Sequence, residues 1–137
     1  MKKKFIYVFT TLLIYTFTAC DETPVVFDNV DGQVALQFAT RSFNITVPPA
    51  GSKVTIPVSV TTISNSDRTF QAVSDEKTTG PAASFKIGVA TIPAGSYEGT
   101  LDVDLNTTSL LDGVAYSLLV KLVAPEGGSA FNNVATI

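Results

Sequence analysis

From Gln33 onward, apolar residues recur at every second position in one short run after another. In a β-strand, successive side chains point to opposite faces, so a repeat of two residues puts all the apolar side chains on one face. A helix needs a repeat of about 3.6 residues, and no stretch after Cys20 sustains one. The runs that keep the period of two cover residues 33–38, 43–47, 53–63, 85–89, 97–105 and 116–122. The sequence therefore predicts an all-β fold made of half-buried strands.

Turn-forming residues separate these runs. Pro48-Pro49-Ala50-Gly51 and Ile92-Pro93-Ala94-Gly95 each combine prolines, which fix φ, with a glycine, which has conformational freedom. The longest loop signal covers residues 74–83, and shorter strands are expected over 68–73 and 130–137. Seven or eight short strands with regularly spaced turns are typical of an Ig-like antiparallel β-sandwich, for which we expect Greek-key connections.

Three details of the strands follow from the same pattern. Pro57 lacks an N–H group, so the strand over 53–63 is expected to be bulged there or to have an open edge. The tetrapeptide Pro-Ala-Gly-Ser occurs at 49–52 and again at 93–96, which predicts equivalent roles for the two strands that follow. The strand over 116–122 has apolar residues on both faces and is therefore expected to be central.

Cys20 is the only cysteine in the 137 residues. The run over 5–18 follows three lysines and is too short to span a hydrocarbon core of about 30 Å, but it has the length of a secretory signal. Phe17-Thr18-Ala19-Cys20 resembles the bacterial lipobox, in which the cysteine is acylated, although Phe17 stands where that motif usually has Leu. We expect residues 1–19 to be a lipoprotein signal peptide and Cys20 to carry the lipid. An ordinary signal peptide with an incidental cysteine is the alternative.

Two acidic residues, Asp21 and Glu22, follow this cysteine directly. Acidic residues at this place resemble the surface-export signal of Bacteroidetes-type lipoproteins, which implies an outer-membrane lipoprotein facing the cell exterior. Residues 20–32 show no sustained period, so we expect a lipidated N-terminus and tether. The chain from the cysteine onward is long enough for one hydrophobic core and too short for two, so residues 33–137 are expected to form one Ig-like β-sandwich domain.

The composition excludes several classes of function. Three of the nine Lys and Arg residues lie in the first four positions, so the chain from Cys20 onward carries six against twelve Asp and Glu, a net charge of −6. A chain without a basic stripe is not expected to bind nucleic acid. The sequence contains no His, which removes Ser-His and Cys-His catalytic pairs and the usual zinc and non-haem iron ligands.

Acidic residues of one strand are the remaining candidates for a metal or catalytic site. Asp102 and Asp104 share a face about 7 Å apart. Calcium needs about 6–8 oxygen ligands, however, and the nearby Asn106 and Asp112 do not supply paired acids. Glu98, Asp102 and Asp104 are also weak candidates for the two catalytic carboxylates of a glycosidase, because any acidic outer face contains carboxylates at such spacings. We expect solvated strand residues, no catalytic residue, no metal, no cofactor and no enzyme activity.

The segment 92–125 resembles a family of Ig-like domains of unknown function in Bacteroidetes lipoproteins. The resemblance rests on Thr-Ile-Pro-Ala-Gly-Ser at 91–96, the alternating strand and polar loop after it, and Tyr-Ser-Leu-Leu-Val-Lys-Leu at 116–122. It extends over the strands from about Val34, and it shares the turn-strand-loop-strand order of Calx-beta domains. Because these are turn and core residues, the resemblance implies a fold and says little about chemistry.

A lipid-anchored sandwich without a catalytic site is expected to act by binding or scaffolding. The last strand, over 130–137, is weak, and an open edge of this kind accepts a strand from a partner. We therefore expect a structural or protein-interaction module with an envelope protein as partner. Glycan capture for a polysaccharide uptake system is the alternative, with the loop over 74–83 helping to form a site. Against it, the chain lacks Trp, and Tyr97 and Tyr116 are predicted on core faces.

Overall fold

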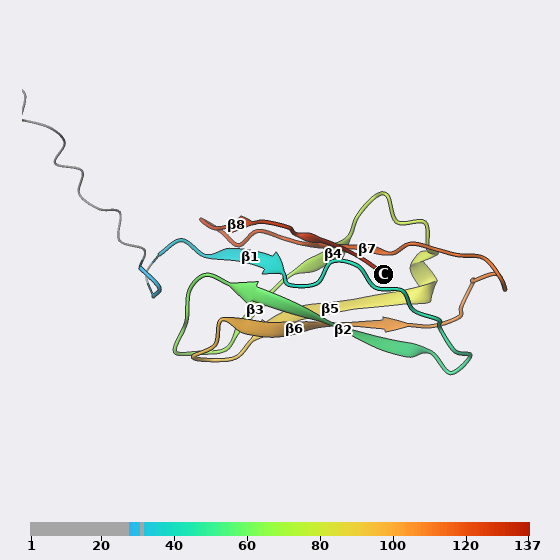
Figure 1. Ribbon diagram of the computed structural model, residues 1–137, viewed down its shortest axis with the longest axis horizontal. Coiled ribbons are helices and arrows are strands. Elements are labelled where there is room, and N and C mark those ends of the chain that lie inside the picture. The colour runs from blue at the N-terminus through green and yellow to red at the C-terminus, as the bar shows by residue number, and fades with distance from the viewer. Residues whose placement is uncertain (1–27, 31) are drawn as a thin grey trace, which may run out of the picture.

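The computed structural model describes residues 28–30 and 32–137, and it confirms the all-β sandwich. Two sheets, one of six strands and one of three, form two layers (Figure 1). The strands are β1 (Ala35–Phe38), β2 (Ser52–Val60), β3 (Arg68–Phe70), β4 (Ala72–Ser74), β5 (Phe85–Ile92), β6 (Glu98–Leu105), β7 (Leu119–Leu122), β8 (Ser129–Ala130) and β9 (Val134–Thr136). A 3-10 turn, η2 (Ala82–Ser84), precedes β5.

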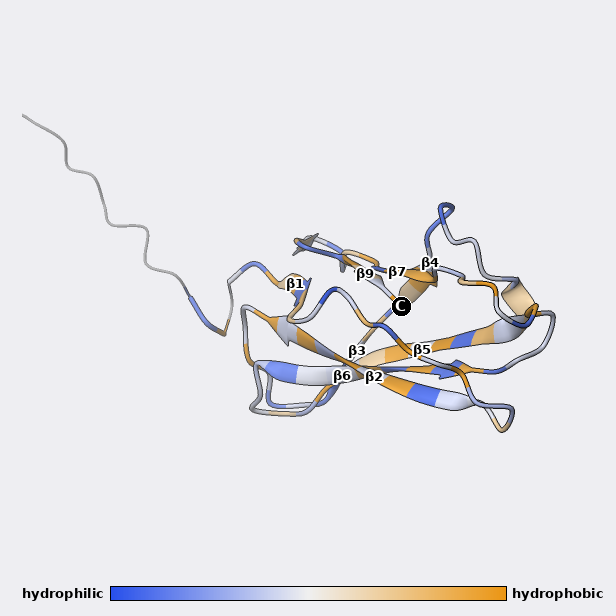
Figure 2. Ribbon diagram, turned by 45° about the vertical axis from the view of Figure 1, so that its right-hand side comes forward, coloured by the Kyte–Doolittle hydropathy of each residue, from blue (hydrophilic) through white to orange (hydrophobic). Residues whose placement is uncertain are grey.

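The larger sheet has the order β3-β5-β6-β2-β1-β8, and the smaller has the order β4-β7-β9. The central position predicted for the strand around residues 116–122 is thus confirmed, because β7 has a neighbour on each side. Apolar and polar residues follow one another along β2, as the alternation predicted (Figure 2). The core between the sheets contains fully buried side chains from both layers, among them Leu36, Ile56, Val58, Ile92, Leu101, Val103, Val120 and Leu122.

The strands that follow the two Pro-Ala-Gly-Ser turns do have equivalent places in the sheet. β2 and β6 lie side by side at its centre and pair antiparallel without a register shift. Each turn has its glycine in the left-handed region, with φ of 83° at Gly51 and 71° at Gly95. That conformation is open to glycine and costly for other residues, which explains why the tetrapeptide recurs.

Pro57 occupies an open edge and is not bulged. It lies opposite Thr100 in the regular pairing of β2 with β6. On its other side, its carbonyl accepts the N–H of Ala39 at 3.1 Å, directly after β1 ends at Phe38. Since proline cannot return a hydrogen bond, pairing of β1 with β2 stops here.

A β-bulge in β5 moves one side chain to the unexpected face. Ile87 lies opposite Val103 and Ala90 opposite Leu101, so β5 has one more residue here than β6. Ala90 is consequently fully buried and Val89 is 44% exposed. The alternation predicted that Val89 shares the inner face of Ile87, and that prediction is wrong because a bulge shifts all later side chains to the opposite face.

Residues 43–47 read as a strand in the sequence, but they belong to neither sheet. An isolated parallel bridge joins Ser42 to Thr136, and the N–H of Phe43 donates to the carbonyl of Thr136 at 2.9 Å. No strand lies beside residues 44–47, so the predicted strand is wrong as a paired element. The segment runs past the labelled C-terminus toward the turn before β2 (Figure 1).

Two stretches of chain change sheets along their length. Residues 68–74 form β3 in the larger sheet and β4 in the smaller one, and the last residues form β8 and β9 in the same way. β8 pairs parallel with β1, which departs from a purely antiparallel arrangement. β9 lies between β7 and residues 41–43, so the last strand is not an exposed edge. Greek-key connections stay a prediction.

Candidate functional site: a cleft at one end of the sandwich

A cleft of about 630 Å³ lies at the end of the sandwich where β5 begins and β6 ends. Residues 43–47 form one wall, and the loop over 106–116 forms the other, with all of its residues except Thr108 and Ser109 in the lining. The lining also includes four apolar side chains that belong to the core or pack against it: Phe85, Leu105, Leu118 and Ile137. A volume of this size lies within the range of about 300–1,000 Å³ found for binding sites.

The wall over 106–116 is shaped by side chains that hydrogen-bond to backbone. The amide of Asn106 donates to the carbonyl of Ala83 at 3.1 Å, and its oxygen accepts the N–H of Thr108 at 2.7 Å. Further along, the hydroxyl of Tyr116 accepts the N–H of Leu111 at 3.2 Å. These contacts tie the loop to η2 and fold it back on the residues before β7.

Exposed apolar side chains line the cleft. Leu111 is 68% exposed, Val114 50% and Ile45 38%. Asp112 is the only carboxylate among the described residues of the lining, and Asn44 and Thr46 add neutral polar groups. An apolar lining with few polar groups is suited to binding a partner or ligand by contact, because general acid–base catalysis needs positioned proton donors and acceptors.

The backbone of one wall has no hydrogen-bond partners. Within the part of the chain that the structure describes, the N–H and C=O groups of residues 44–47 make no hydrogen bond. The same holds for the backbone groups of Tyr116 on the opposite wall. Asn44, Ile45 and Thr46 are exposed, so their backbone groups are open to solvent and to a bound partner.

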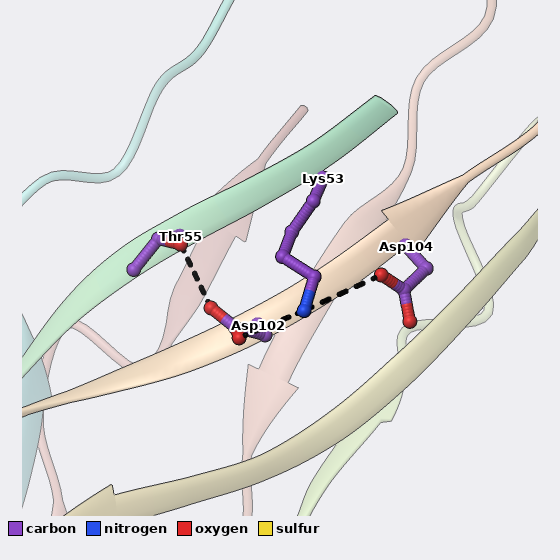
Figure 3. A network of polar contacts seen from close by, with 4 residues as sticks. All are labelled: Lys53, Thr55, Asp102 and Asp104. Atoms are coloured by element: carbon purple, nitrogen blue, oxygen red, sulfur yellow. Dashed lines mark hydrogen bonds and ion pairs between the residues drawn. The ribbon is translucent and has the colours of Figure 1, made fainter. Parts of the chain in front are cut away.

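The acidic candidates lie elsewhere, on the outer face of the larger sheet (Figure 3). Lys53 of β2 places its ammonium 3.3 Å from Asp102 Oδ2 and 3.8 Å from Asp104 Oδ1. The hydroxyl of Thr55 donates to Asp102 Oδ1 at 2.7 Å. This hydrogen bond and that from Lys53 hold the pKa of the Asp102 carboxyl below its ordinary value.

Lys53 thus bridges Asp102 and Asp104 on an exposed face of the sheet, as expected for solvated strand residues. Their side chains are 47% and 59% exposed, and that of Lys53 is 57% exposed. Surface ion pairs of this kind contribute about 0–1 kcal/mol to stability. Among residues 28–30 and 32–137, no group of three or more His, Cys, Asp or Glu side chains is placed to hold a metal ion.

The two tyrosines that follow Cys20 in the sequence, Tyr97 and Tyr116, are both predicted on core faces, and the structure places them differently. Tyr97 lies just before β6 and is 43% exposed, so its predicted core position is wrong; its hydroxyl accepts a hydrogen bond from the Asn29 amide at 3.0 Å. Tyr116 is half-buried and lines the cleft. The loop over 74–83, which is expected to help form a glycan site, contributes only Gly80 to the lining of the cleft. The N–H groups of Thr79 and Gly80 donate to the carbonyl of Ser117.

The predicted lipidation residue Cys20 and the predicted export signal, Asp21 and Glu22, lie outside the described residues. In the described ranges, no helix is long and apolar enough to cross a membrane. Sequence reasoning missed the cleft itself. One feature of the sequence points to the cleft: the apolar pair Leu110-Leu111 lies within an otherwise polar connection. Leu111, the second residue of this pair, is exposed in the structure.

Comparisons with protein-family models, with curated proteins and with solved structures find no match to this chain. The resemblance to Ig-like domains of Bacteroidetes lipoproteins therefore stays a prediction.

Proposed function

We propose that this protein is a non-catalytic, lipid-anchored β-sandwich of the bacterial cell envelope that acts as a protein-interaction module, with the end cleft as its contact site. The observation that carries the proposal is the cleft, where exposed apolar side chains and unpaired backbone groups occur together. Exposed apolar surface of this kind marks sites of association. The lipobox-like segment ending at Cys20 supports a membrane anchor, and Asp21 and Glu22 support display on the outer surface.

A glycan is the alternative ligand, and the cleft suits it less well. Sugar sites present flat aromatic rings and several convergent polar side chains. Here the hydroxyl of Tyr116 already accepts a backbone hydrogen bond, and the amide of Asn106 is engaged at both of its ends.

Site-specific photocrosslinking in cells tests the proposal. In the full chain, a photoreactive phenylalanine derivative replaces Leu111 in the cleft, and in a matched variant it replaces Val89, an exposed apolar residue on β5 outside the cleft. We expect the variant at 111, and not that at 89, to crosslink to one defined envelope protein. Absence of a crosslink at 111 would overturn the proposal, and so would saturable polysaccharide binding that Leu111→Asp abolishes.

A further inference from the structure

The first described residues are fastened to one end of the sandwich. The carbonyl of Asn29 accepts the N–H of Ile63 at 2.8 Å, and the side-chain amide of Asn29 donates to the Tyr97 hydroxyl at 3.0 Å. Ile63 follows the end of β2, and Tyr97 precedes the start of β6. Since β2 and β6 are antiparallel, both contacts lie at the same end of the larger sheet, which we call the entry end.

The two connections that hold Asn29 are also joined to each other. The N–H of Gly95 donates to the carbonyl of Ser64 at 2.8 Å, and the N–H of Ala94 donates to the carboxylate of Asp67 at 2.8 Å. These hydrogen bonds link the connection after β2 to the connection before β6. The place where the chain enters the sandwich is therefore fixed relative to both central strands.

The cleft lies at the opposite end. Leu105, the last residue of β6, lines it, and Leu105 lies opposite Ser52, the first residue of β2. Figure 1 shows the first described residues at one end of the sandwich and the turn before β2 at the other. At about 3.4 Å per residue, the stretch from Tyr97 to Asn106 separates the entry end from the cleft by about 30 Å.

The chain between the predicted lipid and the entry end is short. Cys20 precedes Asp28 by eight positions in the sequence. A stretch of that length spans at most about 29 Å in any conformation. If the cleft faced the membrane, the entry end would stand about 30 Å above the bilayer surface. Even a fully extended tether would then hold the cleft against the lipid headgroups and leave a partner no room to enter.

We propose that the anchored protein stands with its entry end toward the membrane and its cleft away from it. This rests on the proposed function, because it takes Cys20 as the lipid-bearing residue and the cleft as the contact site. It adds where the partner binds. The cleft lies about 30–60 Å from the bilayer surface. Its partner is therefore a soluble protein or a domain that projects from the membrane, and not a segment within the bilayer.

Charge gives the sandwich little reason to lie flat on the membrane. Attraction to anionic lipids takes clusters of about four to eight Lys and Arg. The described residues contain six, and they are divided between the two sheets, with Lys53 and Lys86 on the larger and Lys121 on the smaller. Lys53 already bridges two aspartates, and Arg68 donates to Thr62. Neither outer face therefore carries such a cluster.

Energy transfer to the membrane surface tests the orientation. The lipidated full chain is reconstituted into phosphatidylcholine vesicles that carry acceptor dyes on their headgroups. A donor dye is attached at Ala94→Cys in the entry end or, in a matched variant, at Leu111→Cys in the cleft; both positions are exposed. Cys20 is the only native cysteine and carries the lipid, so each variant has one thiol to label. We expect transfer from position 94 to be at least about threefold more efficient, because its dye lies about 30 Å closer to the membrane.

The outcomes separate this inference from the proposed function. Transfer that is equal at the two positions, or more efficient at 111, would overturn the orientation, and a partner crosslink at 111 would still stand. A chain that does not float with the vesicles would refute the lipid anchor and the orientation with it. A flexible Gly-Ser insertion of about 24 residues between Thr23 and Pro24 should bring the ratio close to one, because the longer tether lets the sandwich turn over. An unchanged ratio would refute tether length as the cause.

Discussion

Gly99 of β6 is a site where the structure predicts a large effect from one methyl group. A Cβ added there would lie 2.0 Å from the carbonyl oxygen of Thr91 and 2.8 Å from Cα of Ile92, both on the neighbouring strand β5. It would also lie 2.7 Å from Cδ1 of Ile92, whose side chain is fully buried. Two of the three clashing atoms are backbone, so a rotamer change does not relieve the overlap.

The expected cost of Gly99→Ala follows from these distances. Overpacking costs about 1–3 kcal/mol where side chains adjust, and more where backbone must move. We therefore expect a loss of at least about 3 kcal/mol in the free energy of unfolding, out of a total of about 5–15 kcal/mol for a domain. At about 4 °C per kcal/mol for a domain of this size, Tm falls by at least about 12 °C.

Two other glycines provide controls for the assay, which is urea unfolding of the purified full chain. Gly80 has only ordinary contacts, at 3.7 Å and 3.9 Å, so Gly80→Ala should change stability by less than about 0.5 kcal/mol. Gly95 has open space but φ of 71°, so Gly95→Ala should cost about 1 kcal/mol through backbone strain alone. A Gly99→Ala variant within about 0.5 kcal/mol of the unmodified protein would refute the packing of β5 against β6 described above.

Three further predictions concern the acidic pair, the bulge and the anchor. Thr55→Val should raise the pKa of the Asp102 carboxyl toward its ordinary value, as measured by carboxyl NMR titration, and an unchanged pKa would contradict the assigned hydrogen bond. Because the folded-state pKa of Asp102 is lowered, its ionised carboxylate stabilises the fold above the unfolded-state pKa of about 3.9. This contribution is lost as the pH falls through the folded-state pKa. Val89→Lys should change the free energy of unfolding by less than about 0.5 kcal/mol, whereas Ala90→Lys should prevent folding, and equal tolerance at both positions would show that the bulge is misplaced. Cys20→Ser should move the protein from the membrane to the soluble fraction of lysed cells, and retention in the membrane fraction would exclude a lipid anchor at this residue.

The sequence predicts those features that are local. Alternation locates β2, β6 and β7, because buried or half-buried residues occupy one face of each strand at every second position. It misplaces Val89, because a bulge depends on how β5 meets β6 and leaves no mark in the alternation beyond a glycine at position 88. Gly88 nevertheless has a reason to be glycine, since a Cβ there would lie 2.9 Å from the carbonyl oxygen of Asp102.

The cleft could not be predicted in the same way. Its walls come from residues 43–47 and 106–116, which are far apart in the sequence and meet only once both sheets have formed. Leu111 is apolar and yet 68% exposed, and a pattern read along the chain does not show which apolar residues lack a partner. The predicted core position of Tyr97 is wrong for a related reason. The alternation along β6 puts Tyr97 on the inward face, but this residue lies before the strand begins at Glu98.

The failed strand prediction at residues 43–47 and the cleft have one physical cause. Phe43 and Val47 are half-buried while Asn44 and Thr46 are exposed, so the segment keeps much of the alternation of a strand. The backbone groups of residues 44–47 nevertheless make no hydrogen bond to another described residue. Alternation reports that one side of a segment packs against the core, and it does not report whether the backbone has a paired neighbour. The segment therefore keeps the pattern of a strand because Phe43 packs against the core, and it borders the cleft because no neighbouring strand covers residues 44–47 within the described part of the chain.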